Sequence, residues 1–182
     1  MSLDFNPYIV AYSWSGSGFG SKYANPATLP PNAGRKLRFN PTGTQIVTPN
    51  PFGSPYVDSY AWNPGFGTKY SQPASGIPGS AFEVSFTPDG QHISIAHGNS
   101  PYISAYNWSS SGFGAKHANP SSLPQADGKG VNFDQSGKFV AIVGTSNPYV
   151  TVYEWSSGFG AKVTPPVTLP TSASFAVNFS PI

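Results

Sequence analysis

The sequence has no cysteine and little charge, since only 9% of its 182 residues are charged. Without cysteine, the chain can form neither disulfide bonds nor thiolate metal sites. Nine Lys and Arg against seven Asp and Glu give a net charge of +2. This small positive excess is not the clustered basic surface that nucleic-acid binding requires. We therefore expect no nucleic-acid partner.

Long apolar runs are also missing. The longest run, Phe139 to Val143, is far shorter than the roughly 20 residues that a membrane-spanning helix needs. Residues 1–7 lack the basic start and apolar stretch of a secretory signal. We expect no membrane partner, and a protein that is cytoplasmic as made or associated with a virion.

Glycine, proline and aromatic residues are abundant. The chain has 20 Gly and 20 Pro, which break helices, so helices of ordinary length are not expected. It also has 13 Phe, 10 Tyr and 4 Trp, whereas disordered chains are poor in aromatics and rich in charge. These features predict a single all-β domain over residues 1–182.

Several short motifs recur with a period of about 47 residues, which is the mark of a repeat architecture. Each period holds Pro-Tyr, then Trp, then Gly-Phe-Gly, then Lys, and later a Phe. The four Trp residues are Trp14, Trp62, Trp108 and Trp155. The approximate repeats are 1–47, 48–94, 95–141 and 142–182.

Each repeat is predicted to form four short antiparallel strands. In the third repeat, residues 102–108 alternate in polarity as a half-buried strand does, and 113–117, 130–133 and 138–143 make three more. The turn 88–90, Pro-Asp-Gly, suits a hairpin because Gly readily adopts a positive φ. Four-stranded units repeated every 40 to 50 residues are typical of a β-propeller.

Residues 86–96, FTPDGQHISIA, followed by a strand that contains Trp108, resemble the WD-repeat propellers. The regular Pro-Tyr and Gly-Phe-Gly repeats are also similar to phage-encoded and environmental propeller proteins. The sequence departs from the WD pattern because Ser15, Asn63, Ser109 and Ser156 stand where Asp should follow Trp. It also lacks the Gly-His dipeptide, so the resemblance implies a divergent lineage without the family's buried His-Ser-Trp-Asp network.

The resemblance implies that the C-terminal strand 175–179 closes blade one, with a short contribution from Ser2 to Phe5. Two rings are then open. The chain closes alone as a four-bladed ring, which we favour, or it forms half of an eight-bladed ring as a homodimer.

No arrangement of residues indicates catalysis or a cofactor. The seven acidic residues are scattered, and no Gly-x-Ser-x-Gly elbow occurs. His92 and His97 are five apart on one predicted strand, so they point to opposite faces and cannot share a metal ion. His117 is interpreted as a packing position. The sequence therefore predicts no metal, no cofactor and no enzyme activity.

The recurring aromatics are predicted to form the repeat core, because one identical position per blade indicates packing. This set comprises Trp14, Trp62, Trp108, Trp155, Phe39, Phe86, Phe133 and Phe179.

Candidate contacts to a partner fall into three groups. The recurring ones are Lys22, Lys69, Lys116 and Lys162, and Tyr8, Tyr56, Tyr102 and Tyr149. The residues that break the repeat in the loops are Arg35, Phe52, His97, Asp127 and Lys129. We expect a structural or protein-interaction module that binds a protein partner or itself, as part of a phage or other multi-protein assembly. The alternative is a glycan-binding propeller with one weak site per blade.

Overall fold

The computed structural model describes residues 1–180, and within them the chain is built from short strands without helices. The strands are β1 (Tyr12–Ser15), β2 (Gly18–Lys22), β3 (Arg38–Phe39), β4 (Gln45–Pro49), β5 (Val57–Trp62), β6 (Phe66–Lys69), β7 (Ala81–Phe86), β8 (His92–His97), β9 (Ile103–Ser109), β10 (Gly112–Lys116), β11 (Gly128–Phe133), β12 (Phe139–Gly144), β13 (Val150–Trp155) and β14 (Phe159–Lys162).

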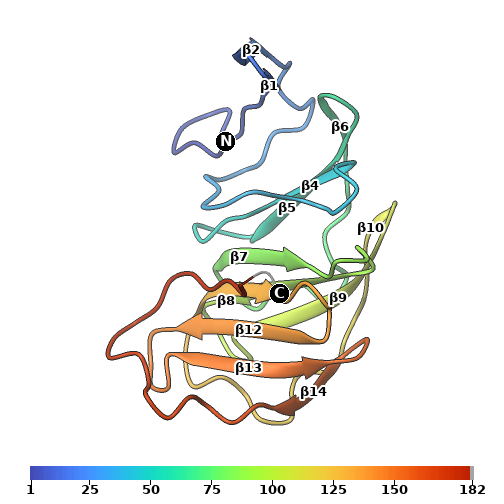
Figure 1. The fold of residues 1–182 in the computed structure, drawn as a ribbon. Coiled ribbons are helices and arrows are strands. Elements are labelled where there is room, and N and C mark those ends of the chain that lie inside the picture. The colour runs from blue at the N-terminus through green and yellow to red at the C-terminus, as the bar shows by residue number, and fades with distance from the viewer. Residues whose placement is uncertain (181–182) are drawn as a thin grey trace.

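The strands form sheets in chain order, each strand pairing antiparallel with the next. Three sheets have four strands, β3 to β6, β7 to β10 and β11 to β14, and the first sheet in the described residues has two, β1 and β2. Figure 1 shows these sheets following one another along an arc, with β1–β2 at one end and β11–β14 at the other. The predicted all-β fold of four repeats is confirmed.

A tight turn joins the first two strands of each complete sheet. Gly43, Gly90 and Gly137 have φ values of 68°, 70° and 69°, a conformation that glycine adopts at little cost. The Asp89 carboxylate accepts hydrogen bonds from the Thr87 hydroxyl at 2.5 Å and from the Gln91 amide at 3.0 Å. Such hydrogen bonds within the turn explain why the residue before each of these glycines is short and polar, namely Thr42, Asp89 and Ser136.

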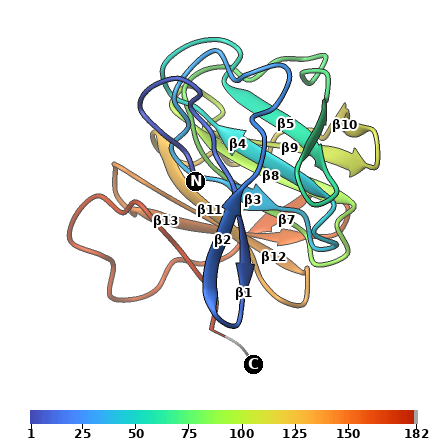
Figure 2. The same cartoon turned by 90° about the horizontal axis from the view of Figure 1, so that it is seen from above.

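The inner strands β7 and β11 lie side by side, and the view from above in Figure 2 shows β3, β7 and β11 near the middle of the molecule. The main buried clusters lie between successive sheets. One combines residues of β8 and β9 with β11, β12 and β13, including Ile103, Val131, Ile142 and Tyr153. Core residues therefore join neighbouring repeats and fix the spacing of the sheets.

The segment 175–179, predicted to close blade one, carries no strand in the structure. It lies against β11 instead, where the backbone of Phe175 and Ala176 approaches Gly130 and the side chains of Asn178 and Asn132 form a hydrogen bond. Closure by this segment stays a prediction. Within residues 1–180, the structure has no helix that is long and apolar enough to cross a membrane.

Candidate functional site

The recurring Trp residues lie at the junctions between successive sheets. Trp62 makes an edge-to-face contact with Tyr23 of the preceding repeat, with ring centroids 5.3 Å apart. Trp108 and Trp155 make the corresponding contacts with Tyr70 at 6.3 Å and His117 at 5.3 Å. Each Trp also packs edge-on against the Phe of its own first strand, through Phe39, Phe86 and Phe133 at 5.0–5.4 Å.

A second recurring residue, which the sequence analysis missed, completes each junction. Tyr60, Tyr106 and Tyr153 are fully buried two residues before the Trp. Their hydroxyls donate to the backbone carbonyls of Thr28, Gly76 and Ser122 in the preceding repeat, at 3.0, 2.7 and 2.6 Å. The signal was present in the sequence as a Tyr-x-Trp pattern in every repeat. Burial raises the pKa of each of these phenols.

A third contact, at two of the junctions, comes from the first residue of the strand that follows the tight turn, which is Gln45 on β4 and His92 on β8. Gln45 accepts a hydrogen bond from the Trp108 indole at 2.7 Å, and its amide donates to the Tyr70 hydroxyl at 3.1 Å. One repeat later His92 takes this place and makes an edge-to-face contact with Trp155, with its Nδ1 3.1 Å from His117 Nε2. Burial, and then the charge of His92, lower the pKa of His117.

The predicted partner contacts that recur in every repeat have unequal surroundings. Lys22 is exposed, and Lys116 and Lys162 are half-buried. Lys69 forms an ion pair with buried Asp58 at 2.6 Å, and burial raises the pKa of this carboxyl although Lys69 opposes the rise. The four Tyr residues of the Pro-Tyr motif, Tyr8, Tyr56, Tyr102 and Tyr149, are half-buried after cis X-Pro bonds.

Of the predicted core aromatics, Trp108, Trp155 and Phe133 are buried, while Trp62, Phe86 and Phe179 are half-buried. Trp14 is 70% exposed and Phe39 is 44% exposed.

The structure brings two of the repeat-breaking residues, Arg35 and Lys129, to one cavity of about 330 Å³. The remaining lining residues are Lys36, Phe82 and Phe175. The Lys129 ammonium lies 3.6 Å from the centroid of the Phe82 ring, a cation–π contact, and 3.2 Å from Asp127 Oδ2. Phe175 is 63% exposed, so the cavity has an apolar wall that reaches the solvent.

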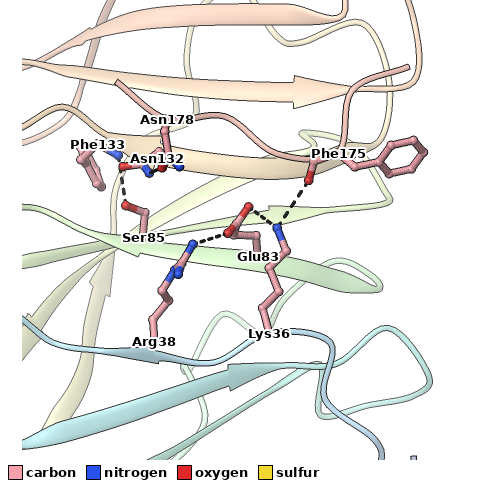
Figure 3. A network of polar contacts seen from close by, with 8 residues as sticks. All are labelled: Lys36, Arg38, Glu83, Ser85, Asn132, Phe133, Phe175 and Asn178. Atoms are coloured by element: carbon pink, nitrogen blue, oxygen red, sulfur yellow. Dashed lines mark hydrogen bonds and ion pairs between the residues drawn. The ribbon is translucent and has the colours of Figure 1, made fainter. Parts of the chain in front are cut away.

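A buried carboxylate pairs with Lys36, one of the residues that line this cavity (Figure 3). Glu83 on β7 accepts from Lys36 Nζ and from Arg38 Nη2, both at 2.7 Å, and Lys36 also donates to the Phe175 carbonyl at 3.4 Å. Nearby, the Ser85 hydroxyl accepts a hydrogen bond from the Phe133 amide at 3.0 Å. One carboxylate thus pairs with two cations, and Lys36 links this pair to the C-terminal segment through the Phe175 carbonyl.

Four positive groups lie in or beside the cavity, Arg35, Lys36, Arg38 and Lys129, and within residues 1–180 the ion pairs that they form involve two carboxylates, Glu83 and Asp127. Arg35 is exposed and stacks on Phe52, with Cζ 4.9 Å from the ring centroid. The excess of two positive charges beside phenylalanine rings suits a ligand that carries both carboxylate and apolar groups.

His97, the remaining predicted contact, is instead fully buried. Its Nδ1 lies 2.9 Å from the Asn99 carbonyl and its Nε2 lies 2.9 Å from the Ser104 hydroxyl. Within residues 1–180, no group of three His, Asp or Glu side chains is placed to hold a metal ion.

Solved structures resemble this arrangement of sheets. A protein from Lactobacillus plantarum shares 16% identity and a TM-score of 0.61, over 92% of this chain and 50% of that one. The U3-55K structure shares 12% identity and a TM-score of 0.56, over 77% of this chain and 40% of that one. The fold is that of a β-propeller. The chain spans at most about half the length of these structures. No protein-family model matches the sequence, and the comparison with curated proteins finds no relative.

The prediction that the chain is not an enzyme is contradicted. A third similar structure, from Bacteroides uniformis, is provisionally named a 6-phosphogluconolactonase and shares 16% identity and a TM-score of 0.54, over 72% of this chain and 38% of that one. At this identity the likeness shows the fold alone. The prediction rested on motifs such as the serine elbow, and a propeller brings together catalytic side chains from separate blades that short motifs do not reveal.

Proposed function

We propose that this chain is a protein-interaction propeller module, working within a larger assembly such as a phage particle, and that its binding site is the Arg35–Lys129 cavity. The observation that carries the proposal is the surplus of positive charge beside the Phe82 and Phe175 rings. Arg and aromatic side chains are enriched where proteins bind one another. The partner segment that this chemistry recognises is an acidic peptide with an apolar side chain.

The WD-like sequence features support a divergent WD-type lineage for this module. The tight turn is capped by Asp89, yet the Trp108 indole donates to Gln45 of the preceding sheet. The Trp108 indole therefore contributes to the junction between sheets. For the glycan alternative, the structure offers less, because Trp108 and Trp155 are buried in the junctions.

The test is a fluorescence-anisotropy titration of the full chain with a labelled acidic peptide that alternates Glu and Phe, beside the same peptide with Lys for Glu. We expect binding of the acidic peptide only, weakening as salt rises. Arg35→Ala should reduce the affinity about twofold to fivefold, since an exposed ion pair contributes about 0.5–1 kcal/mol. Lys138→Ala, an exposed lysine outside the cavity lining, is the matched control.

Three results would overturn the proposal. The first is equal binding of both peptides, or of neither. The second is binding of oligosaccharides on a glycan array that persists at high salt. The third is hydrolysis of 6-phosphogluconolactone that Arg35→Ala abolishes, which would replace the binding module with an enzyme.

A further inference from the structure

The junction between sheets has the same composition each time it occurs. In each of the three junctions, a buried Tyr hydroxyl reaches a carbonyl of the preceding repeat and a Trp contacts an aromatic ring of that repeat. At two of them, the Trp also meets the residue that follows the tight turn, Gln45 or His92. One sheet supplies the Tyr and Trp, and its predecessor supplies the receiving surface.

The first sheet carries the donating half of a fourth junction without a partner in the described residues. Tyr12 and Trp14 occupy the Tyr and Trp positions of β1, and they are 42% and 70% exposed. The corresponding residues in the third and fourth sheets are at most 6% exposed. Trp14 packs edge-on against Phe19, itself 78% exposed, so an aromatic face stands open to solvent. Large apolar side chains grouped at a surface mark an interaction site.

The last sheet carries the receiving half. By the repeat spacing, Phe139 corresponds to Gln45 and His92, and Val163 corresponds to Tyr23, Tyr70 and His117. Thr168 corresponds to Thr28, Gly76 and Ser122, whose carbonyls accept the Tyr hydroxyls. Phe139 and Val163 are half-buried and Thr168 is exposed. Phe139 and Val163 are more apolar than the residues at the same positions of the earlier junctions, which favours the burial of Trp14.

We propose that the β1–β2 sheet of one copy of this chain docks on the β11–β14 sheet of a second copy. In this fourth junction Trp14 packs on Phe139 and Val163, and the Tyr12 hydroxyl donates to the Thr168 carbonyl. The contact is continuous with the junctions inside the chain, because it repeats their geometry at the next position along the arc. It uses a surface separate from the Arg35–Lys129 cavity, so the two proposals fail independently.

The shape of the arc assigns the docking to a second copy. The two half-junctions lie at opposite ends of the arc in Figure 1. In addition, 92% of this chain aligns with only half of the L. plantarum structure, so a propeller of that length has room for a second chain of this size. A head-to-tail contact of this kind closes when its rotation completes a circle. Two copies of this arc complete it.

The test measures the mass of the full chain by light scattering behind a sizing column. We expect a species of twice the chain mass of 19.2 kDa, held together mainly by the burial of aromatic side chains. Trp14→Ala and Val163→Glu should each shift the mass toward one chain. Phe52→Ala, which removes another exposed ring away from the junction, should leave the dimer intact.

Mixing the two disrupted variants separates a lost contact from a misfolded chain. Trp14→Ala keeps an intact receiving surface and Val163→Glu keeps an intact Trp14, so an equimolar mixture should regain a species of two chains. A wild-type protein that stays monomeric at every concentration would overturn the proposal, whether or not its own two ends join into a ring. A dimer that neither substitution weakens, or a mixture that remains at one chain mass, would overturn it as well.

Cysteine cross-linking gives an independent readout, because the chain has no cysteine of its own. Ser15→Cys and Lys138→Cys lie beside Trp14 and Phe139, and both positions are exposed. A short bismaleimide should join these two single-cysteine variants when they are mixed. Ser110→Cys, an exposed position in the middle of the arc, replaces Lys138→Cys as the control. Equal cross-linking of both mixtures would overturn the proposed contact.

Discussion

At the scale of single residues, the buried tyrosines of the junctions show how one hydroxyl group links two repeats. The ring of Tyr106 is fully buried and its hydroxyl donates to the Gly76 carbonyl at 2.7 Å. Removing the hydroxyl leaves that carbonyl without this partner, which typically costs 1–3 kcal/mol when the group is buried. The expected loss of stability therefore includes the cost of leaving the Gly76 carbonyl without the Tyr106 hydroxyl.

Tyr106→Phe should therefore lower the free energy of unfolding by about 1–2 kcal/mol. The measurement is urea unfolding followed by far-UV circular dichroism at a low protein concentration. Tyr23→Phe is the control, because half-buried Tyr23 contacts Trp62 through its ring, which Phe keeps, so stability should change by less than about 0.5 kcal/mol. Equal losses in the two variants would show that the hydroxyl bond is not the cause.

His97 links stability to pH. The Asn99 carbonyl can only accept, so Nδ1 carries the proton and Nε2 accepts from the Ser104 hydroxyl. Burial lowers the pKa of His97 from 6.5 to about 4. Since the unfolded chain takes up a proton at a higher pH than the folded chain, His97 costs no stability above pH 6.5. Its destabilising effect grows as the pH falls from 6.5 to about 4.

The expected loss from His97 over this pH range is about 3 kcal/mol, from 1.36 kcal/mol per pKa unit. Free energies of unfolding measured at pH 7.0, 5.5 and 4.5 should fall in the wild type. His97→Gln keeps a donor and an acceptor without titrating, so its fall should be shallower. His117→Gln serves as a comparison for the other histidine whose pKa is lowered. An unchanged slope in His97→Gln would exclude His97 as the source.

At the scale of elements, the junctions behave as interchangeable units with different side chains. Gln45 with Tyr70 supports Trp108, whereas His92 with His117 supports Trp155. The amide oxygen of Gln45 accepts from the Trp108 indole nitrogen, whereas the imidazole of His92 makes an edge-to-face contact with the Trp155 ring. The same backbone position therefore serves two kinds of contact.

Transferring one junction onto the other tests this equivalence. His92→Gln combined with His117→Tyr should give Trp155 the hydrogen bond that Trp108 has, and raise the free energy of unfolding at pH 7 by about 1 kcal/mol. His92→Gln alone should gain less, because its amide lacks the Tyr hydroxyl. Urea unfolding of both variants decides the question. A loss of more than about 1 kcal/mol in the double variant would mean that the junctions are not equivalent.

The sequence was sufficient to predict the elements because their signals are local. Alternating polarity, the Pro-Asp-Gly turn and the period of 47 residues located the strands, and β9 at Ile103–Ser109 agrees with the predicted 102–108 to within one residue. Partners between repeats were not predictable in the same way. Gln45 and Trp108 are 63 residues apart, and nothing in either neighbourhood indicates that they form a hydrogen bond.

The sequence predicted only some of the residues that form the cavity. Arg35 and Lys129 stood out because they break the repeat, and the structure places both at its lining. Glu83, Phe82 and Phe175 were missed, since a single acidic residue on a strand and two ordinary phenylalanines carry no local signal. These three residues contribute to the cavity because the fold brings residues of separate repeats together, and the local sequence around each residue does not reveal that arrangement.

At the scale of the whole molecule, the arc leaves two complementary surfaces at its ends. Inside the chain the same surfaces are joined by a covalent linker, so their association depends little on concentration. Between copies the association must overcome the loss of translational freedom, and stability then depends on concentration by mass action. The melting temperature therefore reports whether the fourth junction forms between copies.

If the fourth junction forms between copies, a tenfold rise in protein concentration adds about 1.4 kcal/mol to the free energy of unfolding per mole of dimer. This raises the melting temperature by about 2 °C for a dimer of this size. Scanning calorimetry over two decades of concentration should show this shift in the wild type and in Phe52→Ala. Trp14→Ala should melt at a lower temperature that does not move with concentration, because the exposed ring that drives docking is gone. A wild-type melting temperature that is independent of concentration would instead mean that the molecule unfolds as a single chain, with Trp14 left in solvent or covered by its own end.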